Sequence, residues 1–443
     1  MLDANKTMPI AIGIDFGTTN SVVAFALPDG QVESMSWDAA WSSVPGDRTE
    51  TFRSALMFWR EGRKVAHAAG PEAIARALTE TGEQRFIQSI KTHLASRLFT
   101  ETRLYGQRFT VEQLISTFLM DLFREGHWGE EGLRRAESLP AVGGRPVVFA
   151  GERPDDVLAM ERLRQSFSGA GLKQVDFAYE PLGAAYWYAR GLDHDETILV
   201  ADFGGGTSDF SVLTFAHENG KLEAKPLAHS GVGVAGDTFD YRILDHVIAP
   251  RLGKGSLYRS FDKLLPIPAY FHAAFAQWHQ LSWLKSPQTL AELRKLQTSA
   301  EEPGALADLI TLIECDLGFE LHRAVGALKA ELSSKEKATF RFSREGIMIE
   351  AEVARKDFEA WIADDIAALA RAMDEALAAA NVAPNAIDAV FLTGGTSYVP
   401  AVRSLFVERF GEKRVHIGDA FQSVASGLAL LAADRARQNE SRA

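Results

Sequence analysis

Two stretches of the chain place an aspartate just before a turn of small residues. Residues 10–27 read IAIGIDFGTTNSVVAFAL, and residues 197–213 read TILVADFGGGTSDFSVL. In each stretch the aspartate, Asp15 or Asp202, stands near the end of an apolar run. A turn of small residues lets backbone amides reach phosphate oxygens, and a carboxylate offers the hard oxygen that suits Mg²⁺ and its water shell. The two stretches together predict a phosphate-binding pair of turns with a magnesium ion.

These residues need elements that hold them in place. Apolar runs on either side of a short turn of Gly, Thr, Ser and Asn are typical of a β-hairpin. Either hairpin alone is equally explained as a tight turn with a capping aspartate. The matched pair, separated by close to half the chain, instead indicates a duplicated lobe.

The rest of the chain alternates between strand and helix patterns. Such alternation predicts mixed α/β lobes, and the Arg-rich end, 433–443, is expected to be a frayed tail. Helices are predicted over 111–123, 155–167 and 183–191, and strands over 145–151 and 174–181. Residues 250–300 show little periodicity, and a long helical pattern then ends at Ser333-Ser334. The C-terminal part is predicted to hold a strand pair over 338–353, a helix of about twenty residues within 357–380, and a last strand and helix over 389–395 and 399–411.

Length and composition exclude several classes of protein. The chain has 443 residues, of which 46% are apolar and 24% charged, which suits two large globular lobes. A net charge of −12 argues against nonspecific binding to nucleic acid. The lone cysteine, Cys315, excludes an intrachain disulfide and is expected to be a small core residue. A polar N-terminus and the lack of an apolar run of ~18–20 residues predict a soluble, cytoplasmic protein without a membrane partner.

A third motif stands near the C-terminus. The strand pattern FLT runs into Gly394 and Gly395, and Pro400 then stands in the first turn of a helix, where proline is tolerated. Glycines at this place allow a flat ring to pack against the backbone. The alternative is an ordinary connection between a strand and a helix.

Four motifs in order resemble a known family. GIDFGTTNS, ADFGGGTSDFS, YEPLGAAYWYARGL and FLTGGTSYVP are similar to the two phosphate motifs, the interlobe connector and the adenosine motif of the DnaK-type heat-shock protein 70 chaperones. The short YegD-like branch is most similar, through HSGVGVAGDTFD and GGRPVVF. The resemblance covers about residues 10–430.

The resemblance implies an α/β fold of the actin-like ATPase type, with two ribonuclease-H-like lobes around a nucleotide cleft. Lobe I is expected over 1–192, with the C-terminal helix 420–436 packing back on it. Lobe II is expected over 193–415, with an inserted subdomain at about 245–345. The chain stops near where the family's ATPase module ends, so no peptide-binding domain is expected. The implied ligands are ATP or ADP with Mg²⁺, and K⁺ is a further candidate ion.

The resemblance also assigns site residues by position. Lys91, within FIQSIKTHLASRLF, matches the family's lysine near the γ-phosphate, although a lysine on a helical face, taken alone, is usually solvated. Glu180 matches the carboxylate that orients the attacking water. Asp15 and Asp202 would hold Mg²⁺ through water, and Asp202 is also assigned as catalytic. The remaining assignments are Gly17, Thr18, Thr19, Asn20, Gly204, Gly205, Gly206, Thr207, Gly236 and Asp237 on the phosphate side, with Thr207 also counted as catalytic, and Lys329, Ser333, Gly394 and Gly395 around the adenosine.

Four positions depart from the family pattern. Gly151 stands where the family has a proline that ends a strand and is a proposed interlobe switch. Ala330 replaces an arginine that stacks on adenine, and Gly326 replaces a glutamate that touches the ribose. Tyr398 replaces the arginine of the adenosine motif. Losing a cation over a ring costs ~0.5–2 kcal/mol of binding, so these residues predict weaker contact with adenine.

The implied function is ATP-gated, chaperone-like regulation of an unknown protein partner. Alternatives are a binding-only pseudo-ATPase module, a small-metabolite kinase and an actin-like filament protein. GVGVAG over 231–236 fits a dinucleotide-binding pattern, but no strand pattern feeds directly into it. The aromatic run over 269–283 is read as core or, as a less favoured alternative, as a partner surface.

Overall fold

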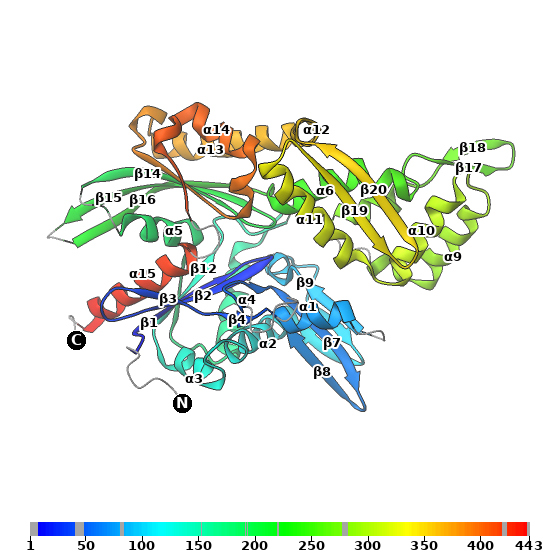
Figure 1. The fold of residues 1–443 in the computed structure, drawn as a ribbon. Coiled ribbons are helices and arrows are strands. Elements are labelled where there is room, and N and C mark those ends of the chain that lie inside the picture. Colours follow the sequence, from blue (N-terminus) through cyan, green and yellow to red (C-terminus); the bar gives the residue numbers. More distant parts are fainter. Residues whose placement is uncertain are drawn as a thin grey trace. The chain divides into compact units, whose positions relative to one another are not determined.

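The computed structural model divides the chain into two compact units (Figure 1). The first comprises Met1–Gly233, Leu369–Ser397 and Ser404–Ala443, and the second comprises Val234–Ala368 and Tyr398–Arg403. The expected lobe boundaries and inserted subdomain stay predictions. The residues that the structure describes are 8–39, 48–79, 84–151, 153–190, 192, 194–218, 221–276, 282–418 and 423–440.

The first unit contains two sheets with the same plan. One has the order β13-β12-β1-β2-β3 and the other the order β16-β15-β14-β21-β22. In each, the first hairpin strand pairs antiparallel with the second and parallel with a later strand of the chain. The predicted hairpins and the duplication are therefore confirmed. The bounds are β1 (Ala11–Phe16), β2 (Asn20–Ala26), β3 (Val32–Ser34), β12 (Ala141–Arg145), β13 (Val175–Tyr179), β14 (Glu196–Phe203), β15 (Ser208–Glu218), β16 (Lys221–Val232), β21 (Ala389–Thr393) and β22 (Val415–Ile417).

Two helices, α5 (Glu180–Ala189) and α15 (Ser423–Glu440), share one hydrophobic core with both sheets. Val22 and Ile198 represent the two sheets in this core, and Ala184 and Leu428 represent the helices. Helix α15 also packs directly on α5, β1 and β2. It continues to Glu440, so the expected frayed tail is wrong over the described part of that stretch. Burial of Leu431, Ala432 and Ala433 explains why the helix persists there.

A second core of the first unit lies under α2 (Val111–Arg124) and α4 (Asp156–Gly169). The start of α2 is fixed by a capping box, in which Thr110 Oγ1 accepts from Gln113 N and Gln113 Oε1 accepts from Thr110 N. The smaller elements of the first unit are α1 (Gly70–Thr79), α3 (Glu130–Ser138), β4 (Trp37–Asp38), β5 (Arg48–Thr49), β6 (Phe52–Arg53), β7 (Ala55–Glu61), β8 (Lys64–Ala69), β9 (Gln84–Gln88), β10 (Glu101–Leu104) and β11 (Gln107–Thr110).

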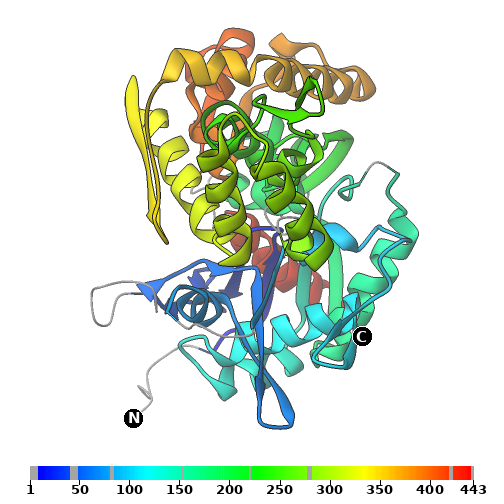
Figure 2. The same ribbon diagram turned by 90° about the vertical axis from the view of Figure 1, so that its right-hand side faces the viewer.

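The second unit is mainly helical, with two separate β-hairpins. Strands β19 and β20 form a long ribbon beside α11, coloured yellow in Figures 1 and 2. This pair and the helical pattern before it confirm the expectation, whereas 250–300 holds a hairpin and helices that the sequence pattern did not show. The bounds are α6 (Gly236–Ile243), β17 (Leu257–Ser260), β18 (Lys263–Pro266), α7 (Tyr270–Ala273), α9 (Pro287–Gln297), α10 (Pro303–Glu314), α11 (Gly318–Ser334), β19 (Lys337–Arg344), β20 (Ile347–Ala354) and α12 (Arg355–Trp361).

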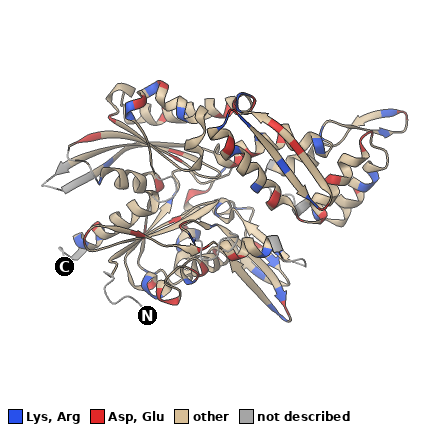
Figure 3. Cartoon of the chain, in the orientation of Figure 1, with Lys and Arg blue, Asp and Glu red and all other residues tan. Residues whose placement is uncertain are grey.

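Helices α13 (Ala363–Ala380) and α14 (Pro400–Phe410) each have residues in both units. The helix expected within 357–380 is divided into α12 and α13 by Ile362, whose ψ of 4° departs from helical geometry. Charged side chains of both signs are interspersed over the helices and strands (Figure 3). Among the described helices, none is both long and apolar enough to cross a membrane.

The strand expected over 145–151 lies earlier in the chain. Strand β12 is Ala141–Arg145, and Pro146 follows it directly. Gly143 lies against the ring of Phe177 in this sheet, where a larger side chain would clash. Packing therefore requires a glycine within the strand, although glycine has a low propensity for strands and is typical of turns. Because Pro146 follows the strand and has no N–H to extend a ladder, the interpretation of Gly151 as replacing a strand-ending proline is wrong.

Two smaller expectations concern single side chains. Cys315 is exposed, which contradicts its expected place in the core, because it follows the last residue of α10 and the helix buries Leu309, Leu312 and Ile313 instead. In the aromatic run, Phe271 and Phe275 are fully buried, as expected of core residues. Residues 277–281 of that run lie outside the described residues.

Candidate functional site

Four carboxylates and one lysine form a cluster within the first unit. Asp15 and Asp202 stand near the ends of β1 and β14, and Glu180 is the first residue of α5. Asp209 is the second residue of β15, and Lys91 lies in a 3₁₀ turn, η1 (Ile90–His93). Their charges act on one another. The structure therefore brings together the two predicted metal residues, the predicted catalytic lysine and the predicted catalytic glutamate.

Lys91 and Glu180 form the closest contact in this cluster. Lys91 Nζ donates to Glu180 Oε1 at 2.5 Å, and the two side chains are only 7% and 11% exposed. Burial acts to lower the pKa of Lys91, but attraction to Glu180, Asp15 and Asp202 outweighs it and raises the pKa. The ammonium group therefore remains charged at physiological pH, as a fixed cation among carboxylates.

The remaining carboxylates are strongly disfavoured in their charged forms. Burial, reinforced by the charge of Glu180 and opposed by Lys91, raises the pKa of Asp15 to about 7. Burial raises the pKa of Asp202 well above its ordinary value, and Glu180 and Asp15 add to this effect. Burial also raises the pKa of Asp209 to about 8, again with Glu180 adding to it. If all four carboxylates were ionised, the cluster would carry more negative charge than one lysine offsets, and burial opposes that state.

A bound divalent cation would favour the ionised forms of these carboxylates. Across the described parts of the chain, no three His, Cys, Asp or Glu side chains converge closely enough to ligate an ion directly. Mg²⁺ commonly keeps several waters and takes only one or two carboxylates from a protein. Asp15 and Asp202 supply such a pair of oxygen donors, so the residues present fit Mg²⁺ held largely through water.

The turn between β1 and β2 is held from outside by Ser54. Its amide donates to Thr19 O at 2.9 Å, and its hydroxyl donates to Gly17 O at 2.7 Å. A Cβ atom at Gly17 would stand 2.1 Å from Asn20 O, so only glycine allows this tight return. Thr18 and Thr19 are half-buried in the turn. The predicted phosphate residues of this turn therefore have a fixed backbone.

The turn between β14 and β15 is closed by a hydrogen bond of its own backbone. Gly204 N donates to Thr207 O at 2.9 Å, which closes a turn that also contains Gly205 and Gly206. Beyond the turn, Asp202 and Asp209 are directly opposite in the strand register. Asp209 Oδ1 accepts a long bond from Val148 N, just after β12, at 3.4 Å. A second carboxylate therefore stands beside the predicted one.

Gly394 directly follows β21, next to this hairpin. Its φ is +85°, and a Cβ atom there would stand 2.0 Å from Phe203 O, so glycine is needed for both reasons. Gly395 begins the 3₁₀ turn η7 (Gly395–Tyr398). Since β21 pairs with β14 up to Asp202 and Thr393, these glycines lie at the same strand end as the acidic cluster.

The other predicted residues lie in the second unit. Lys329 Nζ donates to Gly236 O at 3.0 Å and pairs with Asp240 Oδ1 at 2.8 Å. Ser333 Oγ donates to Lys329 O one turn earlier on α11. Asp237 lies in the first turn of α6. Gly236, Lys329 and Ser333 are thus brought together, whereas the phosphate-side turns belong to the first unit.

Comparison with known proteins agrees with this geometry. The Hsp70 protein family model matches residues 163–256 and 317–440. Three proteins named "Chaperone protein DnaK", from Thermotoga petrophila, Thermotoga sp. strain RQ2 and Thermotoga maritima, are each 26% identical over 426 residues. The chain belongs to the Hsp70 family. The alignments cover 95% of this chain but only 59% of each relative, so it spans about three fifths of their length.

Hsp70 proteins have the actin-like ATPase fold, so the predicted fold class is confirmed, and the two matching sheets are its paired cores. The stretch 257–316, between the two matched ranges, holds the β17–β18 hairpin and helices α7, α9 and α10. The site residues Glu180, Asp202, Lys329 and Gly394 fall within the matched ranges.

Three residues, Ala330, Gly326 and Tyr398, are predicted to depart from the adenosine contacts of the Hsp70 family. Ala330 is exposed on α11, and a Cβ atom at Gly326 would meet open space. Tyr398 is 50% exposed. None of these residues supplies the charged contact that its family counterpart is expected to make.

Sequence reasoning missed three residues of these sites. Asp209 lies opposite Asp202, and counting outward from the Gly204–Thr207 turn would have found it. Asp240 pairs with Lys329 and follows Gly236 by one helical turn. Ser54 gives no signal in the sequence, because its role depends on contacts with a distant turn.

Proposed function

We propose that this Hsp70-family chain binds Mg-ATP at the acidic cluster and hydrolyses it to ADP and phosphate. The observation that supports the proposal most is the buried Lys91–Glu180 pair among Asp15, Asp202 and Asp209. The three aspartates stand on the strands of two matching hairpins whose turns consist of small residues. Phosphoryl transfer needs positioning and charge stabilisation more than covalent chemistry, and this set supplies both.

Each residue has a distinct task in the proposed reaction. The amides of the two turns, with the hydroxyls of Thr18, Thr19 and Thr207, donate to phosphate oxygens. The Lys91 ammonium offsets the charge that develops on the transferred phosphoryl group. Glu180 accepts a proton of the attacking water and holds it in line. Removing one such electrostatic partner costs about 3–4 kcal/mol of transition-state stabilisation.

A bound Mg²⁺ would neutralise charge on the phosphates. Asp15 and Asp202 would hold its water shell, and K⁺ stays a further candidate ion. Lys329, Ser333, Gly394 and Gly395 would contact the adenosine. Because Ala330, Gly326 and Tyr398 lack the family's charged groups, we expect ATP to bind less tightly than in the family pattern.

The proposal extends to regulation of a protein partner. ATP and ADP differ by the phosphate that Lys91 and the two turns contact, so they stabilise different closures of the predicted lobes, 1–192 and 193–415. A partner that prefers one closure would bind and dissociate with the nucleotide. The proteins that match this chain are named as chaperones, and a chaperone-like role in the cytoplasm is the corresponding prediction here.

Calorimetric titration of ATP with and without Mg²⁺, followed by single-turnover hydrolysis, tests the proposal. We expect binding that Mg²⁺ strengthens, and conversion of bound ATP to ADP. Binding without turnover would instead favour a binding-only module, the alternative that the changes at Ala330, Gly326 and Tyr398 support. Small-angle scattering with ATP and with ADP tests the regulatory part. Identical scattering curves would contradict nucleotide-dependent closure.

A further inference from the structure

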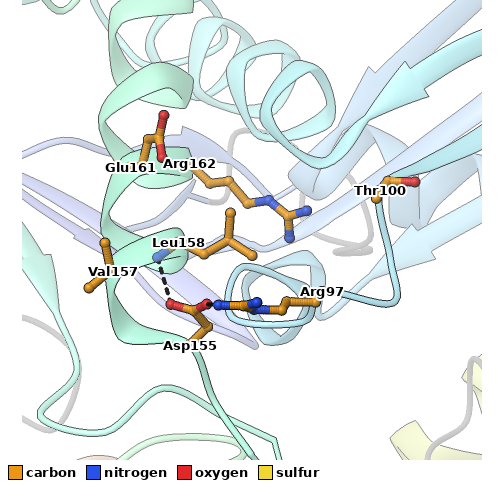
Figure 4. Close-up of a pocket in the computed structure, with 7 residues that line it drawn as sticks. All are labelled: Arg97, Thr100, Asp155, Val157, Leu158, Glu161 and Arg162. Atoms are coloured by element: carbon orange, nitrogen blue, oxygen red, sulfur yellow. Dashed lines mark hydrogen bonds and ion pairs between the residues drawn. The ribbon is translucent and has the colours of Figure 1, made fainter.

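Arg162 gathers the backbone of the segment that follows Lys91. Its Nη1 donates to the carbonyl oxygens of His93, Leu94 and Ser96 at 3.1, 3.1 and 2.9 Å. Its Nη2 donates to Phe99 O at 3.0 Å. Figure 4 shows the Arg162 side chain extending from α4 toward the side of the pocket that carries Arg97 and Thr100. One side chain therefore fixes four carbonyls within seven residues.

Arg162 is a buried charge whose three guanidinium nitrogens all contact oxygen atoms. The side chain is 8% exposed, and its Nε lies 3.2 Å from Glu112 Oε1 on α2. A planar guanidinium offers five N–H donors in a fixed fork. A lysine at this place has no such fork and cannot reach the same set of oxygens. The site is thus specific for arginine.

A second link joins the same two parts of the chain. Asp155, the N-cap of α4, donates its amide to Ala95 O at 3.2 Å and accepts from Arg97 Nε at 2.7 Å. The His93 ring stacks on Phe99 within the segment, with ring centroids 4.5 Å apart. An open cavity of about 670 Å³ remains between α4 and the segment. The start of α4 and segment 93–99 therefore form one connected structure.

This structure bears directly on Lys91. The 3₁₀ turn that carries Lys91 ends at His93, the first residue whose carbonyl Arg162 binds. A single 3₁₀ turn has poor hydrogen-bond geometry and little stability of its own. Ser89, just before the turn, has φ +54°, an uncommon value for a residue other than glycine. The position of the turn must therefore be set by contacts from outside it.

We propose that Arg162 is a positioning residue, which holds segment 93–99 so that the Lys91 ammonium stands at the phosphate site. The proposal rests on the proposed ATP hydrolysis for its effect on rate. The predicted effect of Arg162 on the position of Lys91 is independent of whether the protein hydrolyses ATP. Arg162 acts through Lys91 and does not itself contact the nucleotide.

The test is Arg162→Lys, with Arg164→Lys as a matched control on the same helix. Arg164 is exposed and lies over the Phe177 ring. We expect R162K to slow single-turnover hydrolysis on the order of 10- to 100-fold, since small misplacements of a catalytic group have effects of this size. We expect its ATP affinity to change by less than about threefold, because rate and binding losses separate when only the transition state is affected. The control variant should hydrolyse ATP at the wild-type rate.

A double-mutant cycle with Lys91→Ala separates positioning from general damage to the fold. If Arg162 acts through Lys91, R162K slows the wild type but has little further effect in the K91A background. If R162K slows hydrolysis by the same factor in the K91A background as in the wild type, the proposal is overturned. An R162K variant with wild-type turnover would also overturn it. If R162K does not fold, Glu112→Gln, which removes the carboxylate partner of Arg162, should show a smaller effect in the same direction.

Labelling of Lys91 with an amine-reactive reagent, followed by peptide mass spectrometry, provides a readout without turnover. Buried Lys91 should be protected in the wild type and in R164K, and labelled several-fold faster in R162K. Equal labelling in all three proteins would overturn the proposal even if no ATP were hydrolysed. Conversely, the wild type could fail to hydrolyse ATP while Lys91 is labelled faster in R162K than in the wild type. That result would contradict the proposed ATPase and support the positioning role.

Discussion

The side chains of Lys91 and Glu180 meet at 2.5 Å although the residues are 89 positions apart in the chain. One comes from a short 3₁₀ turn and the other from the first turn of a helix. Three aspartates surround the pair, and burial together with the charge of Glu180 raises the pKa of each. The arrangement is costly in an isolated protein and becomes favourable when a cation and phosphates are bound.

Replacing Glu180 with glutamine should separate binding from chemistry. The amide keeps the shape but accepts a proton poorly, so we expect single-turnover hydrolysis to fall on the order of 10²–10³-fold. ATP affinity should change little. Glu331→Gln, in an exposed pair with Lys335, is the control. An E180Q variant that hydrolyses ATP at the wild-type rate would exclude Glu180 as the residue that orients water.

The raised pKa of Asp209 predicts a specific dependence of stability on pH. Its folded pKa is about 8, against an ordinary value of 3.8, so the folded protein keeps a proton that the unfolded chain loses. Stability should therefore fall as the pH rises from about 4 to about 8. Asp209→Asn removes this contribution, and we expect it to raise the free energy of unfolding at pH 8 by about 1–3 kcal/mol.

Urea denaturation without nucleotide or Mg²⁺, at pH 5 and at pH 8, measures this effect. The gain from D209N should be larger at pH 8. A gain of equal size at both pH values would show that Asp209 is not held in its protonated form.

Ser54→Ala should weaken nucleotide binding without changing the cluster itself. The variant loses the hydroxyl bond to Gly17 O, and one hydrogen bond of this kind contributes about 0.5–1.5 kcal/mol. We expect a several-fold rise in the dissociation constant for Mg-ATP, measured by calorimetry. Ser343→Ala, at an exposed position of β19, is the control. Unchanged affinity in S54A would mean that the β1–β2 turn does not contact the phosphates.

The two predicted metal residues can be tested through thermal stability. Nucleotide at 100 times its dissociation constant should stabilise the wild type by about 2.7 kcal/mol. Part of this gain should require Mg²⁺ and disappear when the ion is chelated. In Asp15→Asn and Asp202→Asn, ATP should stabilise equally with and without Mg²⁺. Variants that keep the full increment from Mg²⁺ would place the ion elsewhere.

Much of the fold could be predicted because its strongest signals are local. Turn residues between apolar runs defined both hairpins, and helical periodicity defined α2 and α4 closely. Strand β12 was misplaced because its small residues, Gly143 among them, are selected by packing against Phe177, which no local pattern reveals. The prediction for Cys315 was wrong because this residue lies just beyond the last residue of α10, where its side chain is exposed.

The site could be predicted only where motif residues adjoin a hairpin turn. Asp15 and Asp202 followed from the pattern itself, while Lys91 and Glu180 required the resemblance to the Hsp70 family. Ser54 and Arg162 could not be predicted, since each acts on backbone atoms that are remote in sequence. Hydrogen bonds to a carbonyl place no demand on the residue type of the partner, so the sequence carries no trace of them.

The most direct measurement is single-turnover ATP hydrolysis by the wild type and by Lys91→Ala, with excess protein, Mg²⁺ and labelled ATP. The account predicts conversion of bound ATP to ADP by the wild type, and a loss on the order of 10²–10³-fold in the variant while ATP still binds. Equal rates in the two proteins, or no ATP binding by the wild type, would contradict the assignment of the acidic cluster as an ATP-hydrolysing site.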